Sequence, residues 1–171
     1  MFNREIKFTL AALLFAFCVY QFILVNIGWG ILLLLLTGLM VLTIFRHENI
    51  IMALYYLRKQ DMFKAEQQLN KIKAPHKLIK SQQAYYYYLN GLIGMQQKGV
   101  GKSEKYFAQA LQLGLRLKED QAVAKLNLAG IYLAKRKKRE AEQYLNQAKK
   151  LDEKKLLADQ IKLLRAQLGR I

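Results

Sequence analysis

Cysteine and proline are almost absent from this chain of 171 residues, which contains one of each. The single cysteine, Cys18, excludes a disulfide framework and agrees with a reducing compartment. It lies within a long apolar stretch. Pro75 is the one proline, and it predicts a break between helices at that point.

The residue types that carry catalysis are equally scarce. His47 and His76 are the only histidines, and Ser81 and Ser103 are the only serines. The pair His47-Glu48 has no second histidine one helical turn later, so it does not match a zinc motif. We therefore expect no enzyme, and we expect neither a cofactor nor a metal site.

Acidic residues are also few, with 12 against 28 lysines and arginines, and the net charge is +16. Setting aside Arg4, Glu5 and Lys7 leaves +15 on residues 46–171. Two kinds of acidic partner suit such a domain, an anionic lipid surface and a nucleic acid. The alternative is ordinary solvated surface charge that serves no partner.

No charged side chain occurs anywhere between Phe8 and Phe45. One straight helix of that length would measure about 57 Å, twice the ~30 Å hydrocarbon core of a bilayer. Asn26, Gly28 and Gly30 provide turn-compatible residues near the middle, and Trp29 suits a membrane interface. This pattern predicts a transmembrane hairpin, with spans at about 8–25 and 28–45.

The flanking charges predict the orientation of this hairpin. Arg4 and Lys7 precede it, Arg46 follows it, and the intervening turn is uncharged. The positive-inside rule then places both termini in the cytoplasm. The residues around Cys18 do not form a signal-peptide cleavage site. We therefore expect an integral membrane protein, most compatible with a bacterial inner membrane, with a segment 1–45 and a cytoplasmic domain 46–171.

Three segments of that domain align with one another without gaps at a fixed repeat length. This length equals the spacing from Ala53 to Gly91 and from Gly91 to Ala129. The third segment has the clearest pattern of small and large residues: Leu128, Ala129, Tyr132, Ala141, Leu145 and Ala148. The corresponding places of the second are Gly91, Gly94, Ser103, Phe107 and Ala110, and those of the first are Ala53, Tyr56, Ala65, Leu69 and Ile72.

This pattern resembles the tetratricopeptide repeat, a helix-turn-helix unit in which small residues let paired helices approach closely. The resemblance implies an all-α fold in which an α-solenoid of about three such repeats, at 46–79, 84–117 and 122–152, follows the hairpin. A stripe of Leu157, Ile161, Leu164 and Leu168 predicts a C-terminal capping helix within 153–171. Ser81, Asp120 and Asp152 are the predicted N-caps.

The first helix of each unit lines the concave face in the resembled family. By this resemblance the partner-binding groove would comprise Ile50, Leu54, Leu57, Tyr85, Tyr88, Leu92, Met95, Leu126, Gly130 and Leu133. An apolar helix or an extended segment of a partner protein would suit such a groove. Alternatively, the chain's own capping helix, or a second copy in a homo-oligomer, covers this face.

Two further motifs lie at predicted turns. Lys135, Arg136, Lys137, Lys138 and Arg139 form a basic patch, which is either a solvated turn or a contact for anionic lipid or RNA. The run from Gly99 to Ser103 looks like the end of a phosphate-binding loop. Gln96 stands where that motif requires glycine, and a predicted helix precedes it, so we do not expect nucleotide binding.

The sequence thus predicts a membrane-anchored scaffold or adaptor that holds a partner protein at the cytoplasmic membrane surface. A membrane-tethered module that binds nucleic acid or the ribosome is the first alternative, because of the positive charge. The second is a structural subunit of a membrane complex, whose hairpin packs on other helices through Gly30, Thr37 and Gly38.

Overall fold

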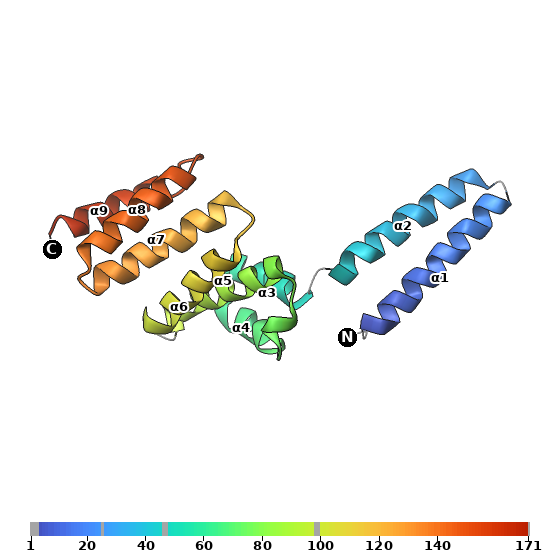
Figure 1. The fold of residues 1–171 in the computed structure, drawn as a ribbon, viewed down its shortest axis with the longest axis horizontal. Helices are drawn as coiled ribbons and strands as arrows, with labels where there is room; N and C mark the ends of the chain where they lie inside the picture. Colours follow the sequence, from blue (N-terminus) through green and yellow to red (C-terminus); the bar gives the residue numbers. More distant parts are fainter. Residues whose placement is uncertain (1–3, 25, 46–47, 98–99, 171) are drawn as a thin grey trace. The chain divides into compact units, whose positions relative to one another are not determined.

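The computed structural model describes residues 4–24, 26–45, 48–97 and 100–170 (Figure 1). Within these residues there are nine α-helices, one short 3-10 helix and no strand, so the predicted all-α class is confirmed. The chain divides into two compact units, Met1–Ile51 and Met52–Ile171.

The first unit contains an antiparallel helical hairpin formed by α1 (Arg4–Ile23) and α2 (Ile27–Phe45) (Figure 1). The two helices approach closely at Gly30, where an added Cβ would lie 2.9 Å from the ring of Phe22. The buried Cys18 thiol donates a hydrogen bond of 3.2 Å to the Gly30 carbonyl oxygen. Gly30 therefore serves the internal packing of the hairpin.

Thr37 and Gly38 are the other two small residues through which the hairpin of a structural subunit would pack on other helices, and they differ from Gly30. The buried Thr37 hydroxyl donates to the Leu33 carbonyl oxygen within α2, at 2.7 Å. Gly38 is exposed, with no atom within 4 Å of an added Cβ.

The prediction that the hairpin crosses a membrane is wrong: none of the helices, over the residues that the structure describes, is long and apolar enough to do so. The uncharged part of α1, Phe8 to Ile23, spans about 24 Å, and α2 spans about 28 Å, both below the ~30 Å of a hydrocarbon core. Three further predictions depend on these spans and are therefore also wrong. They are the integral location in a bacterial inner membrane, the cytoplasmic termini, and the lipid contact through the hairpin.

The hairpin nevertheless exposes many large apolar side chains. They are Leu10, Leu13, Phe15, Phe17, Val19, Tyr20, Phe22, Ile23, Leu24, Ile27, Trp29, Ile31, Leu32, Leu34, Leu35, Leu36 and Leu39. Side chains of these types are more often buried in a folded protein.

The second unit is a succession of helix pairs. Its elements are α3 (Glu48–Arg58, which begins in the first unit), α4 (Met62–Asn70), the 3-10 helix η1 (Pro75–Lys77), α5 (Lys80–Gln97), α6 (Val100–Leu113), α7 (Lys118–Ala134), α8 (Lys138–Leu151) and α9 (Ala158–Leu168). Helix α5 packs on α6, and α7 packs on α8. The second helix of each pair also contacts the first helix of the next, as α4 with α5, α6 with α7 and α8 with α9. The pairs are therefore stacked in chain order.

The turns of the first and third pairs have the same backbone geometry at corresponding places of the repeat. Gln60 and Arg136, which are separated by two sequence periods, have left-handed backbones with φ of 60° and 57°. The amide of Gln60 donates to the carbonyl oxygen of Leu57, and that of Arg136 donates to Leu133. The internal repeat is thus expressed in the folded backbone. The corresponding turn of the middle pair lies outside the described residues.

Small residues allow close helix packing within the pairs. An added Cβ at Gly91 would lie 2.8 Å from the fully buried ring of Phe107, and one at Gly94 would lie 2.6 Å from the hydroxyl of Ser103. In the third pair Ala129, Ala141, Leu145 and Ala148 are buried together in one apolar cluster. Because the same small and large positions meet in both pairs, the repeating pattern reflects helix packing.

The predicted N-caps differ from those in the structure. Helix α7 has Leu117 at its N-cap, and Asp120 lies within its first turn. Asp152 ends α8, and its carboxylate accepts hydrogen bonds from the backbone amides of Leu156 and Leu157, before α9 begins. Ser81 lies inside α5. Aspartate caps the helix in α4, where the Asp61 side chain accepts from the Lys64 amide at 3.0 Å.

Candidate partner-binding face

The predicted groove residues of α5 form a stripe along that helix, but they differ in exposure. Tyr88 is buried, and its ring meets the rings of Phe107 and Tyr85 edge to face. Tyr85, Leu92 and Met95 are only half-buried. Tyr88 is therefore part of the core, whereas its neighbours keep apolar surface in contact with solvent.

Tyr85 is held in place by the next helix pair. Its hydroxyl donates a hydrogen bond of 2.7 Å to the carboxylate of Asp120 on α7. Burial, together with this carboxylate, raises the pKa of Tyr85 to about 12. The phenol therefore stays protonated at neutral pH and links α5 to α7. Sequence reasoning missed this role of Asp120, since two residues so far apart in the chain show no local pattern.

The first helix pair contributes two further half-buried residues of the predicted groove. Leu54 and Leu57 on α3 are half-buried, and both belong to the second unit. Ile50 is buried and belongs to the first unit. We define the α3–α5 face as Leu54, Leu57, Tyr85, Leu92 and Met95.

On α7 the predicted groove residues are covered by α9. Leu126 is buried, and Leu133 packs against the same apolar cluster. That cluster also includes Ile161 and Leu168 from α9, and Leu164 packs against it. An added Cβ at Gly130 would lie 4.0 Å from the side chain of Leu164. This part of the predicted groove is thus internal, as in the alternative in which the chain's own capping helix covers it.

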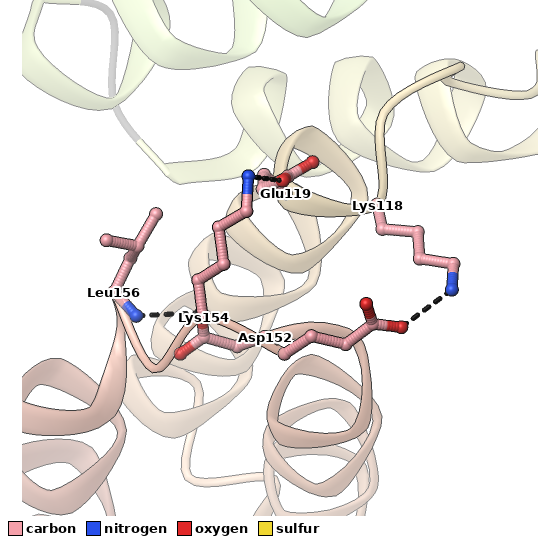
Figure 2. Close-up of polar contacts among 6 residues, drawn as sticks. Lys118, Glu119, Asp152, Lys154 and Leu156 are labelled. Carbon is pink, nitrogen blue, oxygen red and sulfur yellow. Dashed lines mark hydrogen bonds and ion pairs between the residues drawn. The ribbon is translucent and has the colours of Figure 1, made fainter.

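Two ion pairs join the start of α7 to the segment before α9 (Figure 2). Lys118 contacts Glu153 at 2.6 Å, and Lys154 contacts Glu119 at 2.8 Å. The pKa values of both lysines are raised by their carboxylate partners. All four side chains are solvent-exposed, so each pair contributes little to the free energy of folding. They orient the segment that carries α9.

The basic patch consists of cations in different environments. Lys135 forms an ion pair with Glu104 on α6, and this contact lowers the pKa of Glu104. Lys137 lies 3.9 Å from Glu140, and its ammonium group is 5.9 Å from the centre of the Tyr132 ring.

The other three cations of the patch follow the turn into α8. Arg136 occupies the left-handed position of the turn, and Lys138 and Arg139 begin α8. All five side chains of the patch are exposed. Because Lys135 and Lys137 pair with carboxylates of this chain, the patch has less uncompensated charge than its sequence indicates.

The glycine-rich motif lies at the start of a helix and not between a strand and a helix. Helix α5 ends at Gln97, and α6 begins at Val100. Ser103 is fully buried against Gly94, so it serves the packing of these two helices. Gly99 lies outside the described residues.

Comparison with known proteins assigns no relative to this fold. The chain matches no family model, no curated protein and no solved structure.

Proposed function

We propose that the second unit is a tetratricopeptide-like scaffold that binds an acidic segment of another protein through the α3–α5 face. The observation that carries the proposal is the exposure of that face. Its five apolar and aromatic side chains lie on the first helices of two successive pairs, and each keeps part of its surface in solvent. Half-buried apolar side chains at helical spacing suit an amphipathic partner segment.

The rigidity of α5 supports the proposal. Gly91 fits closely against the buried Phe107, and Tyr85 is hydrogen-bonded to Asp120. A surface that is already ordered loses little conformational entropy on binding, so more of the contact energy appears as affinity.

The charge of the domain indicates the chemistry of the partner. Residues 46–171 carry a net charge of +15, which attracts an acidic segment and repels a basic one. The face itself is apolar. We therefore expect a partner segment whose leucine-like or aromatic residues contact the α3–α5 face while aspartate and glutamate residues flank them.

A selection from an unbiased displayed-peptide library, with the full chain as bait, tests this proposal. We expect the enriched peptides to combine apolar anchors with an excess of aspartate and glutamate. Leu92→Gln on the face should weaken their binding by about tenfold, which corresponds to losing one buried leucine contact. Ile79→Gln is the matched control, because Ile79 is an exposed apolar residue just before α5.

Three results would refute the proposal. They are the absence of enriched peptides, enrichment of basic sequences, and equal weakening by the two substitutions. Binding of single-stranded RNA that falls steeply with salt and is unaffected by Leu92→Gln would instead favour the nucleic-acid alternative.

A further inference from the structure

A cleft of about 350 Å³ lies at α9 and the segment that joins it to α8, apart from the α3–α5 face. Four cations, two carboxylates and two apolar side chains line it. The lining residues are Lys149, Asp152, Glu153, Lys155, Ala158, Ile161, Lys162 and Arg165. This volume is within the range of small-molecule sites.

The two carboxylates of the cleft already have partners (Figure 2). Asp152 accepts hydrogen bonds from the amides of Leu156 and Leu157, at 2.9 Å and 2.8 Å. Glu153 pairs with Lys118 at 2.6 Å. The cations that line the cleft are therefore only partly compensated.

Arg165 is oriented by a contact of its own. Its Nη2 donates a hydrogen bond of 2.6 Å to the side-chain oxygen of Asn146 on α8. Arg165 also lines a neighbouring cleft of about 400 Å³, together with Lys138. A planar guanidinium held in this way can present its remaining N–H groups to an oxyanion.

Helix electrostatics explains two of these four cations, and one of them is Arg165 in the last turn of α9. Lys149 lies in the last turn of α8, where the helix dipole favours positive charge. Lys162 lies in the middle of α9, and Lys155 has a left-handed backbone with φ of 55° in the connecting segment. Their convergence with Arg165 on one cleft therefore requires another explanation.

We infer that this cleft binds a small anionic molecule that carries at least two adjacent phosphate groups. Lysines act as point charges for phosphate, and arginine can bind two of its oxygens at once. Adjacent phosphates provide enough negative charge for cations from α8, α9 and the connecting segment. None of the eight lining residues is aromatic, so the site has no platform on which nucleic-acid bases would stack.

Calorimetric titration of the full chain with tripolyphosphate, at constant ionic strength, tests this inference. We expect saturable binding that the double variant Lys149→Gln/Lys162→Gln weakens by at least about tenfold, because two charge-assisted contacts are lost. Lys77→Gln/Lys80→Gln is the matched control, since it removes the same charge from exposed positions outside the cleft. It should change the affinity less than about twofold.

Arg165→Lys provides a second test, because it keeps the charge but removes the planar fork. We expect it to weaken binding too, with unchanged thermal unfolding of the free protein. Absence of saturable binding, or equal weakening by the two double variants, would overturn the inference.

Discussion

The ring of Phe107 occupies the space that a side chain at position 91 would need. A Cβ at Gly91 would lie 2.8 Å from Cε1 of Phe107, and this ring is fully buried. Helices α5 and α6 can approach closely only because residue 91 is glycine. The corresponding residue of the third pair is Ala129, which packs in the same cluster as Leu145.

Replacing Gly91 by alanine should therefore destabilise the protein, although alanine favours a helix over glycine by about 1 kcal/mol. Forcing a methyl group against a buried ring costs about 1–3 kcal/mol. We expect a net loss of about 1 kcal/mol in the free energy of unfolding, measured by urea denaturation. Gly101→Ala on α6 is the control and should not destabilise, because nothing lies within 4 Å of its added Cβ.

A second substitution checks the cause of that loss. Phe107→Leu should be less harmful in the Gly91→Ala background than in the wild type, because leucine vacates part of the space. If the effects of the two substitutions were simply additive, the close contact would not be what disfavours alanine at position 91.

The hydrogen bond between Tyr85 and Asp120 should contribute measurably to stability. Tyr85→Phe removes the hydroxyl and should lower the free energy of unfolding by about 1 kcal/mol. Asp120→Asn should have a smaller effect, because the amide oxygen can still accept the bond. A Tyr85→Phe variant as stable as the wild type would contradict the role of Tyr85 in joining α5 to α7.

Three tyrosines make stability sensitive to alkaline pH. Burial is the main cause that raises the pKa of Tyr85 and Tyr132 to about 12, and it raises that of Tyr88 as well, from the ordinary value of 10.0. In the unfolded chain these phenols ionise near pH 10, so their contribution to the free energy of unfolding is complete below that value. It is lost as the pH rises from about 10 towards 12.

The measurement for this prediction is urea denaturation at increasing pH from neutral to alkaline. We expect the wild type to lose stability above about pH 10, and Tyr85→Phe to lose less over the same interval. An identical dependence of the free energy of unfolding on pH in both proteins would show that Tyr85 ionises normally in the folded state.

The carboxylate of Asp152 should matter more than that of its neighbour Glu153. Asp152 is buried and accepts two backbone hydrogen bonds before α9, so Asp152→Ala should cost about 1–2 kcal/mol. Glu153 makes an exposed ion pair with Lys118, and Glu153→Ala should leave the unfolding midpoint unchanged. The opposite order would mean that the exposed ion pairs, and not the backbone contacts, hold α9.

The sequence predicted a turn at the basic patch of the third pair, and the structure places the turn between α7 and α8 there. Gln60 and Arg136 share a left-handed backbone because the small and large positions on either side of them recur with the same period. Close helix packing requires small and large residues that recur at a fixed spacing, so it can be recognised from the sequence alone. The apolar run likewise predicted two helices near the positions of α1 and α2, but hydropathy alone led to the wrong conclusion about membrane spans.

The path of α9 could not be predicted from the same pattern. Leu126 has the spacing of a groove residue, yet it is buried under α9. That cover depends on the segment before α9, where Lys155 has a left-handed backbone and Asp152 binds two amides. Neither feature is periodic. The convergence of Lys149, Lys162 and Arg165 on one cleft has the same origin.

Site-specific photo-crosslinking, with a selected acidic peptide as the ligand, tests whether the α3–α5 face binds the partner. A photoreactive residue at Leu92 should capture the peptide efficiently, whereas one at Ile79 should capture little. An excess of unlabelled peptide should abolish the adduct at Leu92, and moderate salt should not. Equal capture at both positions, or capture only at Ile79, would contradict the proposal that the α3–α5 face binds the partner.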